Sequence, residues 1–190
     1  QTWTGRSRSL PVHQSLATVR SVFIIGLMSG KSEDPAKRPQ RQRPAHQPSI
    51  QFGNRKIIQF ITVCSKDRRP NLANGRIHHQ LIRVWRQNSP YHVGRYVIMP
   101  DHLHLFCSPG VSPPEPLGPW IRFWKSSVAK QSTLPGKLWQ RDFWDTQPRA
   151  HESYTTKWSY VRNNPVRAGL ARSPDDWPFQ GEIFPLRWHD

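Results

Sequence analysis

The segment from Tyr96 to Phe106, YVIMPDHLHLF, constrains the fold of this chain more than any other. Its two halves are rich in β-forming residues and are separated by a Pro-Asp turn signal, so we expect two strands that pair as a hairpin. Side chains alternate between faces along a strand. His102 and His104 should therefore project from one face, and Leu103 and Leu105 from the other. Two imidazoles side by side on a rigid strand are half of a metal site.

The segments around this hairpin predict a small α+β domain. Runs of β-branched and aromatic residues predict strands, and apolar residues at helical spacing predict amphipathic helices. The expected strands are residues 56–63, 91–99, 102–107 and 138–145, and the expected helices are residues 74–87, 117–130 and 151–164. The order β-α-β-β-α-β followed by a helix is the ferredoxin-like or RRM-like arrangement, an antiparallel sheet with one added C-terminal helix.

The first 54 residues differ in composition from the rest. Residues 31–49 are rich in Pro, Gln and Arg and contain almost no large apolar residue. Such a segment cannot bury enough surface to offset its ordering entropy, so we expect residues 1–54 to be a largely disordered basic extension. We expect a folded domain over residues 55–180, which contains the two histidines, and a C-terminal tail over residues 181–190.

The charge of the chain indicates a polyanionic partner. Lys and Arg number 28 against 12 Asp and Glu, a net charge of +16, and about ten of these charges lie outside the first 50 residues. DNA, RNA and anionic membrane surfaces all fit such a surplus. No run of 18 apolar residues is present, so we expect no membrane-spanning helix. The candidate phosphate contacts are Arg122, Lys125, Lys130, Arg141, Lys157, Arg162 and Arg167.

Two features near residue 141 remain open to more than one interpretation. Arg141 is close in sequence to Asp142 and Asp145, so it could form an ion pair or contact DNA. The aromatic residues of the same segment could stack on unpaired bases, but aromatic residues of a predicted strand are more often part of a core. We therefore expect Trp139, Phe143 and Trp144 to be core residues.

The last predicted helix offers what a two-histidine site lacks. Asn164 follows Tyr160 by four residues, which places both on one face of a continuous helix, away from the apolar stripe that includes Tyr154. An amide oxygen can serve as a third metal ligand, and a tyrosine hydroxyl can attack phosphorus as a nucleophile. Asn163 is adjacent, so the choice of Asn164 depends on helical spacing alone.

Three motifs occur in an order that resembles a known family. They are MPDHLHL at residues 99–105, WQRDFWD at residues 139–145 and YVRNNPVRAGL at residues 160–170. Together they resemble the REP-associated tyrosine transposases, relatives of the IS200/IS605 transposases within the HUH single-strand nuclease superfamily. The resemblance implies that His102, His104 and Asn164 bind Mg or Mn, and that Tyr160 is the catalytic nucleophile. The resemblance extends over residues 55–179, and residues 1–50 match nothing in the family.

The resemblance also implies a function. Members of the family cut single-stranded DNA near the hairpins of repetitive extragenic palindromes, form a link to the 5′ phosphate and rejoin ends. We therefore expect a DNA endonuclease and strand transferase acting in the cytoplasm at the nucleoid, as a monomer or a homodimer. The alternative is a domesticated protein that binds hairpin DNA without catalysis. A replication initiator of the same superfamily is a third option, which the NPVRAGL run argues against.

Overall fold

The computed structural model describes residues 46, 57–87, 89–134, 136–148 and 151–186. The chain divides into two units, residues 1–34 and 35–190, and every described residue belongs to the second. The extension predicted over residues 1–54 therefore lies outside the described residues, apart from His46. Within these described ranges, no helix combines the length and the apolar character that crossing a bilayer requires.

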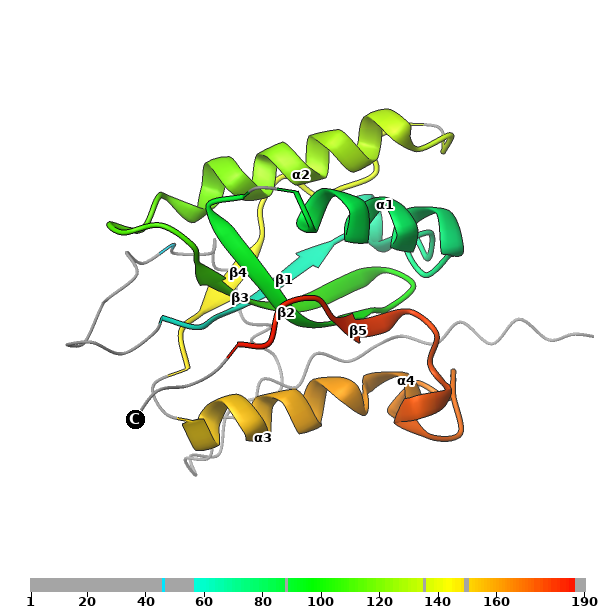
Figure 1. Ribbon diagram of the computed structural model, residues 1–190. Coiled ribbons are helices and arrows are strands. Elements are labelled where there is room, and N and C mark those ends of the chain that lie inside the picture. Colours follow the sequence, from blue (N-terminus) through cyan, green and yellow to red (C-terminus); the bar gives the residue numbers. More distant parts are fainter. Residues whose placement is uncertain (1–45, 47–56, 88, 135, 149–150, 187–190) are drawn as a thin grey trace, which may run out of the picture. The chain divides into compact units, whose positions relative to one another are not determined.

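A five-stranded antiparallel sheet forms the centre of the second unit, with strand order β4-β1-β3-β2-β5 (Figure 1). The strands are β1 (Gln59–Cys64), β2 (Tyr91–Ile98), β3 (His102–Pro109), β4 (Trp144–Thr146) and β5 (Gln180–Glu182). Strands β2 and β3 form the hairpin that the Pro-Asp turn predicts, with Val97 opposite His104. The α+β fold class expected from the sequence is confirmed.

Helices cover both faces of the sheet. On one face lie α1 (Gly75–Trp85) and α2 (Leu117–Gln131), and on the other lie α3 (His151–Arg162) and α4 (Asn164–Arg167), as Figure 1 shows. Two short 3-10 turns, η1 (Lys66–Arg68) and η2 (Pro174–Asp176), complete the described elements. Local capping sets at least one boundary, because the side chain of Asn74 accepts a hydrogen bond from the backbone N–H of Ile77 at the start of α1.

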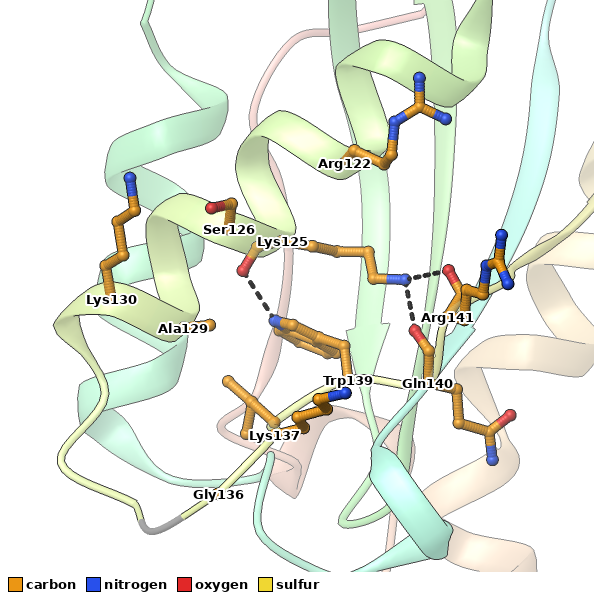
Figure 2. A pocket seen from close by; sticks show the side chains of 11 residues that line it. Arg122, Lys125, Ser126, Ala129, Lys130, Gly136, Lys137, Trp139, Gln140 and Arg141 are labelled. Atoms are coloured by element: carbon orange, nitrogen blue, oxygen red, sulfur yellow. Dashed lines mark hydrogen bonds between the residues drawn. The ribbon is translucent and has the colours of Figure 1, made fainter.

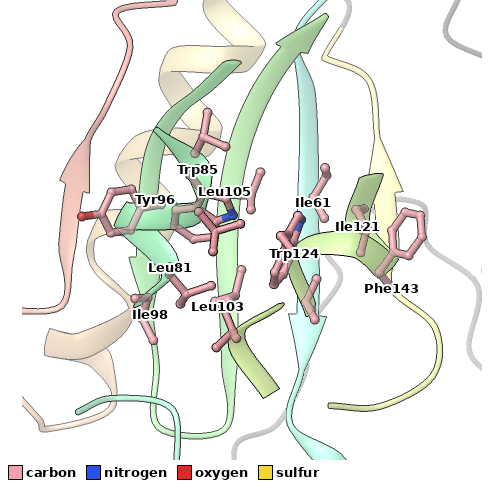
Figure 3. Packing of buried hydrophobic residues seen from close by; sticks show 14 of the residues in the cluster. Ile61, Leu81, Trp85, Tyr96, Ile98, Leu103, Leu105, Ile121, Trp124 and Phe143 are labelled. Atoms are coloured by element: carbon pink, nitrogen blue, oxygen red, sulfur yellow. The ribbon is translucent and has the colours of Figure 1, made fainter. Parts of the chain in front are cut away.

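The alternation along β3 divides the core between these two layers. Leu103 and Leu105 are fully buried and pack against the α1–α2 layer, where Trp85 and Trp124 meet edge to face with ring centroids 5.7 Å apart (Figure 3). Phe106, which projects the opposite way, packs in a separate cluster on the α3 side. Each large buried side chain of this kind contributes about 1.5–3 kcal/mol through burial. The sheet is thus held from both sides.

The strand expected over residues 138–145 is wrong in extent. Only Trp144–Thr146 form β4, and an isolated bridge joins Trp139 to Ser65. The segment before β4 is drawn into the core, because Trp139 and Phe143 are buried as expected. Trp144, in contrast, is 44% exposed, so its assignment to the core is corrected.

A fifth strand was not expected from the sequence. Strand β5 pairs with β2, and the indole N–H of Trp177 donates to the backbone oxygen of Ile98 at 2.9 Å just before it. The backbone N–H of Ile183 and Phe184 also donate to β2. Residues 181–184, assigned to the tail from sequence, therefore extend the sheet. The sequence QGE carries no β-forming signal, so only pairing with β2 makes it a strand.

Candidate active site and nucleic-acid interface

His102 and His104 lie on the face of β3 that α3 and α4 cover. Phe106, two residues further along the same face, packs edge-on against Tyr154 of α3 with ring centroids 4.8 Å apart. Both imidazoles are buried, their ring centroids are 4.8 Å apart, and their planes meet at 81°. The strand alternation therefore brings the two rings together as predicted, and directs them toward the helical layer that carries Tyr160.

A hydrogen bond at Nδ1 holds each imidazole in place. Nδ1 of His102 donates to Oδ1 of Asp101 at 2.6 Å, and Oδ2 of Asp101 is 2.7 Å from the Arg68 guanidinium. Nδ1 of His104 lies 2.8 Å from the hydroxyl of Thr62 on β1. Burial opposes ionisation of Asp101, but the bond from His102 and the nearby positive charges bring its pKa below the usual range. Partners at Nδ1 fix ring orientation and make Nε2 the nitrogen through which a metal would bind.

His104 is kept neutral by its surroundings. Burial lowers its pKa well below the usual value, and the positive charges of His102, Arg68, Lys157 and Arg167 lower it further. A histidine must be neutral to bind a metal ion, because protonation removes the lone pair. The cations Arg68 of η1, Lys157 of α3 and Arg167 of α4 therefore all act on the pKa of His104.

Arg167 and Lys157 connect the helical layer to the histidines. The Arg167 guanidinium lies 3.8 Å from the centre of the Tyr160 ring and donates to the Tyr160 backbone oxygen at 3.3 Å. The Lys157 ammonium lies 4.7 Å from the centre of the Phe60 ring, which in turn stacks on His104 at 5.3 Å. Arg167 thus contacts the candidate nucleophile and acts electrostatically on a candidate metal ligand.

The continuous helix expected over residues 151–164 is wrong. Helix α3 ends at Arg162, and α4 begins at Asn164 with Pro165 in its first turn. Proline has no backbone N–H and collides with the carbonyl four residues earlier, so it ends one helix and begins another. Tyr160 is 52% exposed while Asn164 is 9% exposed. The argument that placed Tyr160 and Asn164 on one helical face therefore does not apply.

The donor types nevertheless fit a divalent cation. In the described part of the chain, no cluster of three or more His, Cys, Asp and Glu side chains could hold a metal. A third protein ligand beside His102 and His104 must then be of another type. Asn164 is buried in the layer that the histidines face, whereas Asn163 is exposed and its amide donates to the Ser159 backbone oxygen at 2.8 Å. Imidazole nitrogens with an amide oxygen match Mn²⁺ more closely than Mg²⁺, which prefers oxygen ligands.

A second group of predicted residues meets in a basic pocket beside α2. Arg122, Lys125 and Lys130 from α2 line it together with Lys137 and Arg141 from the segment before β4 (Figure 2). All but Lys125 are exposed. Four candidate phosphate contacts, from α2 and from the segment before β4, thus border one hollow, and Lys137 joins them although the sequence did not single it out.

Lys125 has a structural role in this pocket. Its ammonium donates to the backbone oxygens of Gln140 at 2.6 Å and Arg141 at 3.0 Å, and its own backbone oxygen accepts from the Trp139 indole at 3.0 Å (Figure 2). Burial lowers the pKa of Lys125 to about 8. The structure therefore corrects its assignment as an exposed phosphate contact.

The remaining candidates differ in their availability. Arg162 pairs with Asp175, whereas Asp145 pairs with His46 at 2.6 Å. Among the described residues, Arg141 forms no ion pair with an acidic side chain, so the ion pair that the sequence left open does not form there. The segment that carries Arg141 is also bonded to the strand beside the histidines, because the Gln140 N–H donates to the carbonyl of Cys64, the residue paired with His102 across the sheet.

Comparison with known proteins supports the resemblance seen in the motifs. No protein-family model matches the chain. The REP-associated tyrosine transposase of Escherichia coli K12 is 26% identical over 142 residues, which cover 68% of this chain and 82% of that protein. The chain is a homologue of the REP-associated tyrosine transposases. A candidate REP-associated tyrosine transposase of Haemophilus influenzae Rd is 23% identical over 158 residues, covering 69% of this chain and 86% of that protein.

The fold agrees with a solved REP-associated tyrosine transposase. The structure of that protein bound to a REP hairpin aligns with a TM-score of 0.57 and 24% identity, over 71% of this chain and 82% of that chain. The match supports the arrangement of sheet and helices described above. The structural match does not assign roles to individual residues, so those of this transposase homologue depend on the contacts described above.

Sequence reasoning missed four residues of this transposase homologue. Thr62 and Arg68 lie outside the three motifs, and Lys137 lies just before the second, so no local pattern marks them. Asp101 lies within the first motif, next to His102, and an acidic residue beside a candidate ligand was a usable signal for an orienting group. Thr62 could be found only from the pairing of β1 with β3.

Proposed function

We propose that this protein cleaves and rejoins single-stranded DNA beside a hairpin through a phosphotyrosine link formed by Tyr160. The observation that carries the proposal is the buried pair of His102 and His104, each held at Nδ1, facing the helices that carry Tyr160 and Asn164. Partners at Nδ1 that fix two adjacent imidazoles are typical of a histidine metal site. Homology to proteins named as tyrosine transposases supports this role.

In the proposed site, His102, His104 and Asn164 would hold Mn²⁺ or Mg²⁺. When bound, the cation withdraws charge from the scissile phosphate and stabilises the charge that develops in the transition state. Asp101 and Thr62 would maintain the ring orientations that this requires. Arg167, which contacts Tyr160 and influences His104, would supply positive charge for the phosphate oxygens.

The proposed reaction is an exchange of one phosphoester for another. The Tyr160 hydroxyl loses its proton and attacks phosphorus, so that a P–O bond to tyrosine forms as the bond to the 3′ oxygen breaks. That oxygen takes up a proton and leaves as a 3′ hydroxyl, while the 5′ phosphate stays on the protein. Attack by a 3′ hydroxyl reverses these steps and releases Tyr160, so no external energy source is required.

The DNA hairpin would be bound through the basic residues. The solved relative is bound to a REP hairpin. Exposed cations line the α2 pocket of this protein, and cations of this kind can contact phosphate. Phosphate contacts of this kind position a nucleic acid without reading its sequence. We assign Arg122, Lys130, Lys137 and Arg141 to this role, with Lys157 and Arg167 on the histidine side of the sheet.

A cleavage assay tests the proposal. The full chain is incubated with a labelled oligonucleotide that carries a palindromic hairpin and single-stranded flanks, with Mn²⁺ or Mg²⁺, and resolved on a denaturing gel. We expect a covalent adduct that EDTA prevents and Tyr160→Phe abolishes. Tyr154→Phe is the matched control, because Tyr154 is buried in the core and its loss should leave the adduct intact.

Two outcomes would contradict parts of the proposal. If hairpin binding persists but no adduct forms with either metal, the protein is a hairpin-binding protein without catalysis. If Tyr160→Phe still forms the adduct, another residue is the nucleophile.

A further inference from the structure

Trp144 lies at the end of a row of residues that leads across the sheet to His104. Strand β4 is the edge strand beside β1, and Trp144 is paired directly with Thr62. Thr62 is in turn paired directly with His104 and lies within hydrogen-bond distance of its ring. Directly opposite residues of paired strands project from the same face. Trp144, Thr62 and His104 therefore share the face of the candidate active site.

The two residues that flank Trp144 face the opposite side of the sheet. Phe143 belongs to the core on the α1–α2 side, and Asp145 is paired with Ile61 of that same core. Trp144 itself is 44% exposed, and no ring among the described residues contacts its indole. Single exposed apolar side chains are common, so the exposure of Trp144 alone is not evidence of a binding role. What matters is that a large exposed indole stands on the face of the histidines, at the open edge of the sheet.

The distance suits a nucleic acid that passes over the histidines. Neighbouring strands lie about 4.8 Å apart, so the backbone at Trp144 is about 10 Å from that at His104. At a stacked rise of 3.4 Å per nucleotide this spans about three nucleotides. The intervening face is also electropositive, because Lys157 lies over Phe60, a neighbour of His104. An aromatic side chain beside cations is the usual means of holding unpaired bases.

We propose that Trp144 stacks on one unpaired base of the DNA, within about four nucleotides of the phosphate that Tyr160 attacks. The inference deepens the proposed function, since it requires a single-stranded DNA substrate on the histidine face. Stacking there would set the register of the strand, so that one phosphate rather than its neighbours reaches the histidines. Trp144 would thus act by positioning the strand, without taking part in the chemistry.

Binding measurements that do not depend on cleavage test this assignment. Tyr160→Phe is used as the background, so that DNA binds without reacting. Hairpin oligonucleotides carry either 2-aminopurine or an abasic site at each of four positions on both sides of the cleavage point. Their dissociation constants and fluorescence are measured with Trp144, Trp144→Ala and Trp144→Phe. The control is Val111→Ala, which shortens an apolar side chain that is also 44% exposed but lies in the loop between β3 and α2.

One position in the strand should respond to Trp144. Trp144→Ala should weaken binding about 5- to 100-fold and relieve 2-aminopurine quenching at that position. An abasic site there should abolish the difference between Trp144 and Trp144→Ala. Trp144→Phe should recover most of the affinity, and Val111→Ala should change nothing. In the Tyr160→Phe background, the abasic scan identifies which nucleotide position contributes to binding without any change at residue 144. A folding defect in Trp144→Ala therefore does not affect the identification of that nucleotide.

The outcomes separate this inference from the proposed function. One outcome is that the effects of Trp144→Ala and of an abasic site on the dissociation constant multiply, within twofold, at every position. In that case the stacking assignment is wrong, even when the wild-type protein forms its adduct. If coupling at one position is found but the wild-type protein forms no adduct with either metal, the stacking assignment stands and the catalytic proposal fails. If single-stranded flanks add nothing to hairpin affinity, the stacking assignment is overturned.

Discussion

The hydroxyl of Thr62 lies 2.8 Å from Nδ1 of His104, across the pairing of β1 with β3. This contact joins β1 to a candidate metal ligand on β3, the central strand of the sheet, and sets the orientation of the ring. For a neutral imidazole that binds a metal through Nε2, Nδ1 carries the proton and donates to the threonine oxygen. Thr62 is therefore an outer partner of the proposed metal site.

Replacing Thr62 by valine should weaken metal binding while leaving the fold intact. Removal of an outer partner of a histidine ligand typically costs about 10- to 100-fold in metal affinity, and valine keeps the β-branched shape. We expect Mn²⁺ affinity, measured by calorimetry, to fall in that range. Thr146→Val is the control, because Thr146 is exposed on the neighbouring strand. Equal affinities for Thr62→Val and the wild-type protein would show that the contact does not tune the site.

The adjacent residues Asn163 and Asn164 allow a matched test of which asparagine is the third metal ligand. Asn164 is buried at the start of α4, whereas Asn163 is exposed and bonds to the backbone of α3. Asn164→Ala should lower Mn²⁺ affinity at least about tenfold, as loss of a ligand requires, and Asn163→Ala should not. Competition with a fluorescent chelator measures both. A larger effect of Asn163→Ala would move the ligand by one residue.

The basic pocket should determine the salt dependence of hairpin binding. The triple variant of Arg122, Lys130 and Lys137 to glutamine removes three exposed charges of the pocket. Each lost phosphate contact reduces the slope of log K against log salt by about 0.9, so the slope should fall by about 3. Arg76→Gln, an exposed charge of α1, is the control. The slopes are obtained from binding isotherms measured at salt concentrations of about 50 to 200 mM. An unchanged slope would exclude the pocket from the DNA interface.

Stability should rise with pH because of Lys125. Burial lowers its pKa to about 8 from an ordinary value of 10.5. Between these values the unfolded chain binds the proton and the folded chain does not, so folding is favoured increasingly as pH rises from about 8 toward 10.5. The difference in unfolding free energy between the wild-type protein and Lys125→Met should therefore grow over this interval in urea titrations. Lys130→Met, which removes an exposed lysine from the same helix, is titrated alongside as the control for loss of a charge. A flat difference for Lys125→Met would contradict the predicted direction.

Much of the candidate site could be predicted from local sequence. The alternation of His102, Leu103 and His104 requires only that the segment be a strand, because neighbouring side chains on a strand point in opposite directions. The surplus of positive charge likewise indicates a polyanionic partner without knowledge of the fold. Tyr160 and Asn164 were brought forward by a different argument, the spacing on one helix, and the break at Asn163 removes that argument while leaving both residues in the layer that the histidines face.

Other features depend on contacts between distant segments. The exposure of Trp144 follows from its place on an edge strand, and the role of Lys125 follows from carbonyls 15 and 16 residues away. The sequence QGE becomes β5 only because β2 offers an unpaired edge. In each case a local pattern was either absent or indicated the wrong environment.

The sequence by itself determined which side chains share a face within an element, where turns interrupt the chain, and the surplus of positive charge. The tertiary structure decided that Thr62 meets His104, that Asn164 begins a separate helix, and that Trp144 stands on the histidine face. Periodicity is a property of neighbouring residues and can be read locally. Strand register and the packing of one layer on another arise from pairing between residues far apart in the chain, which no local pattern encodes.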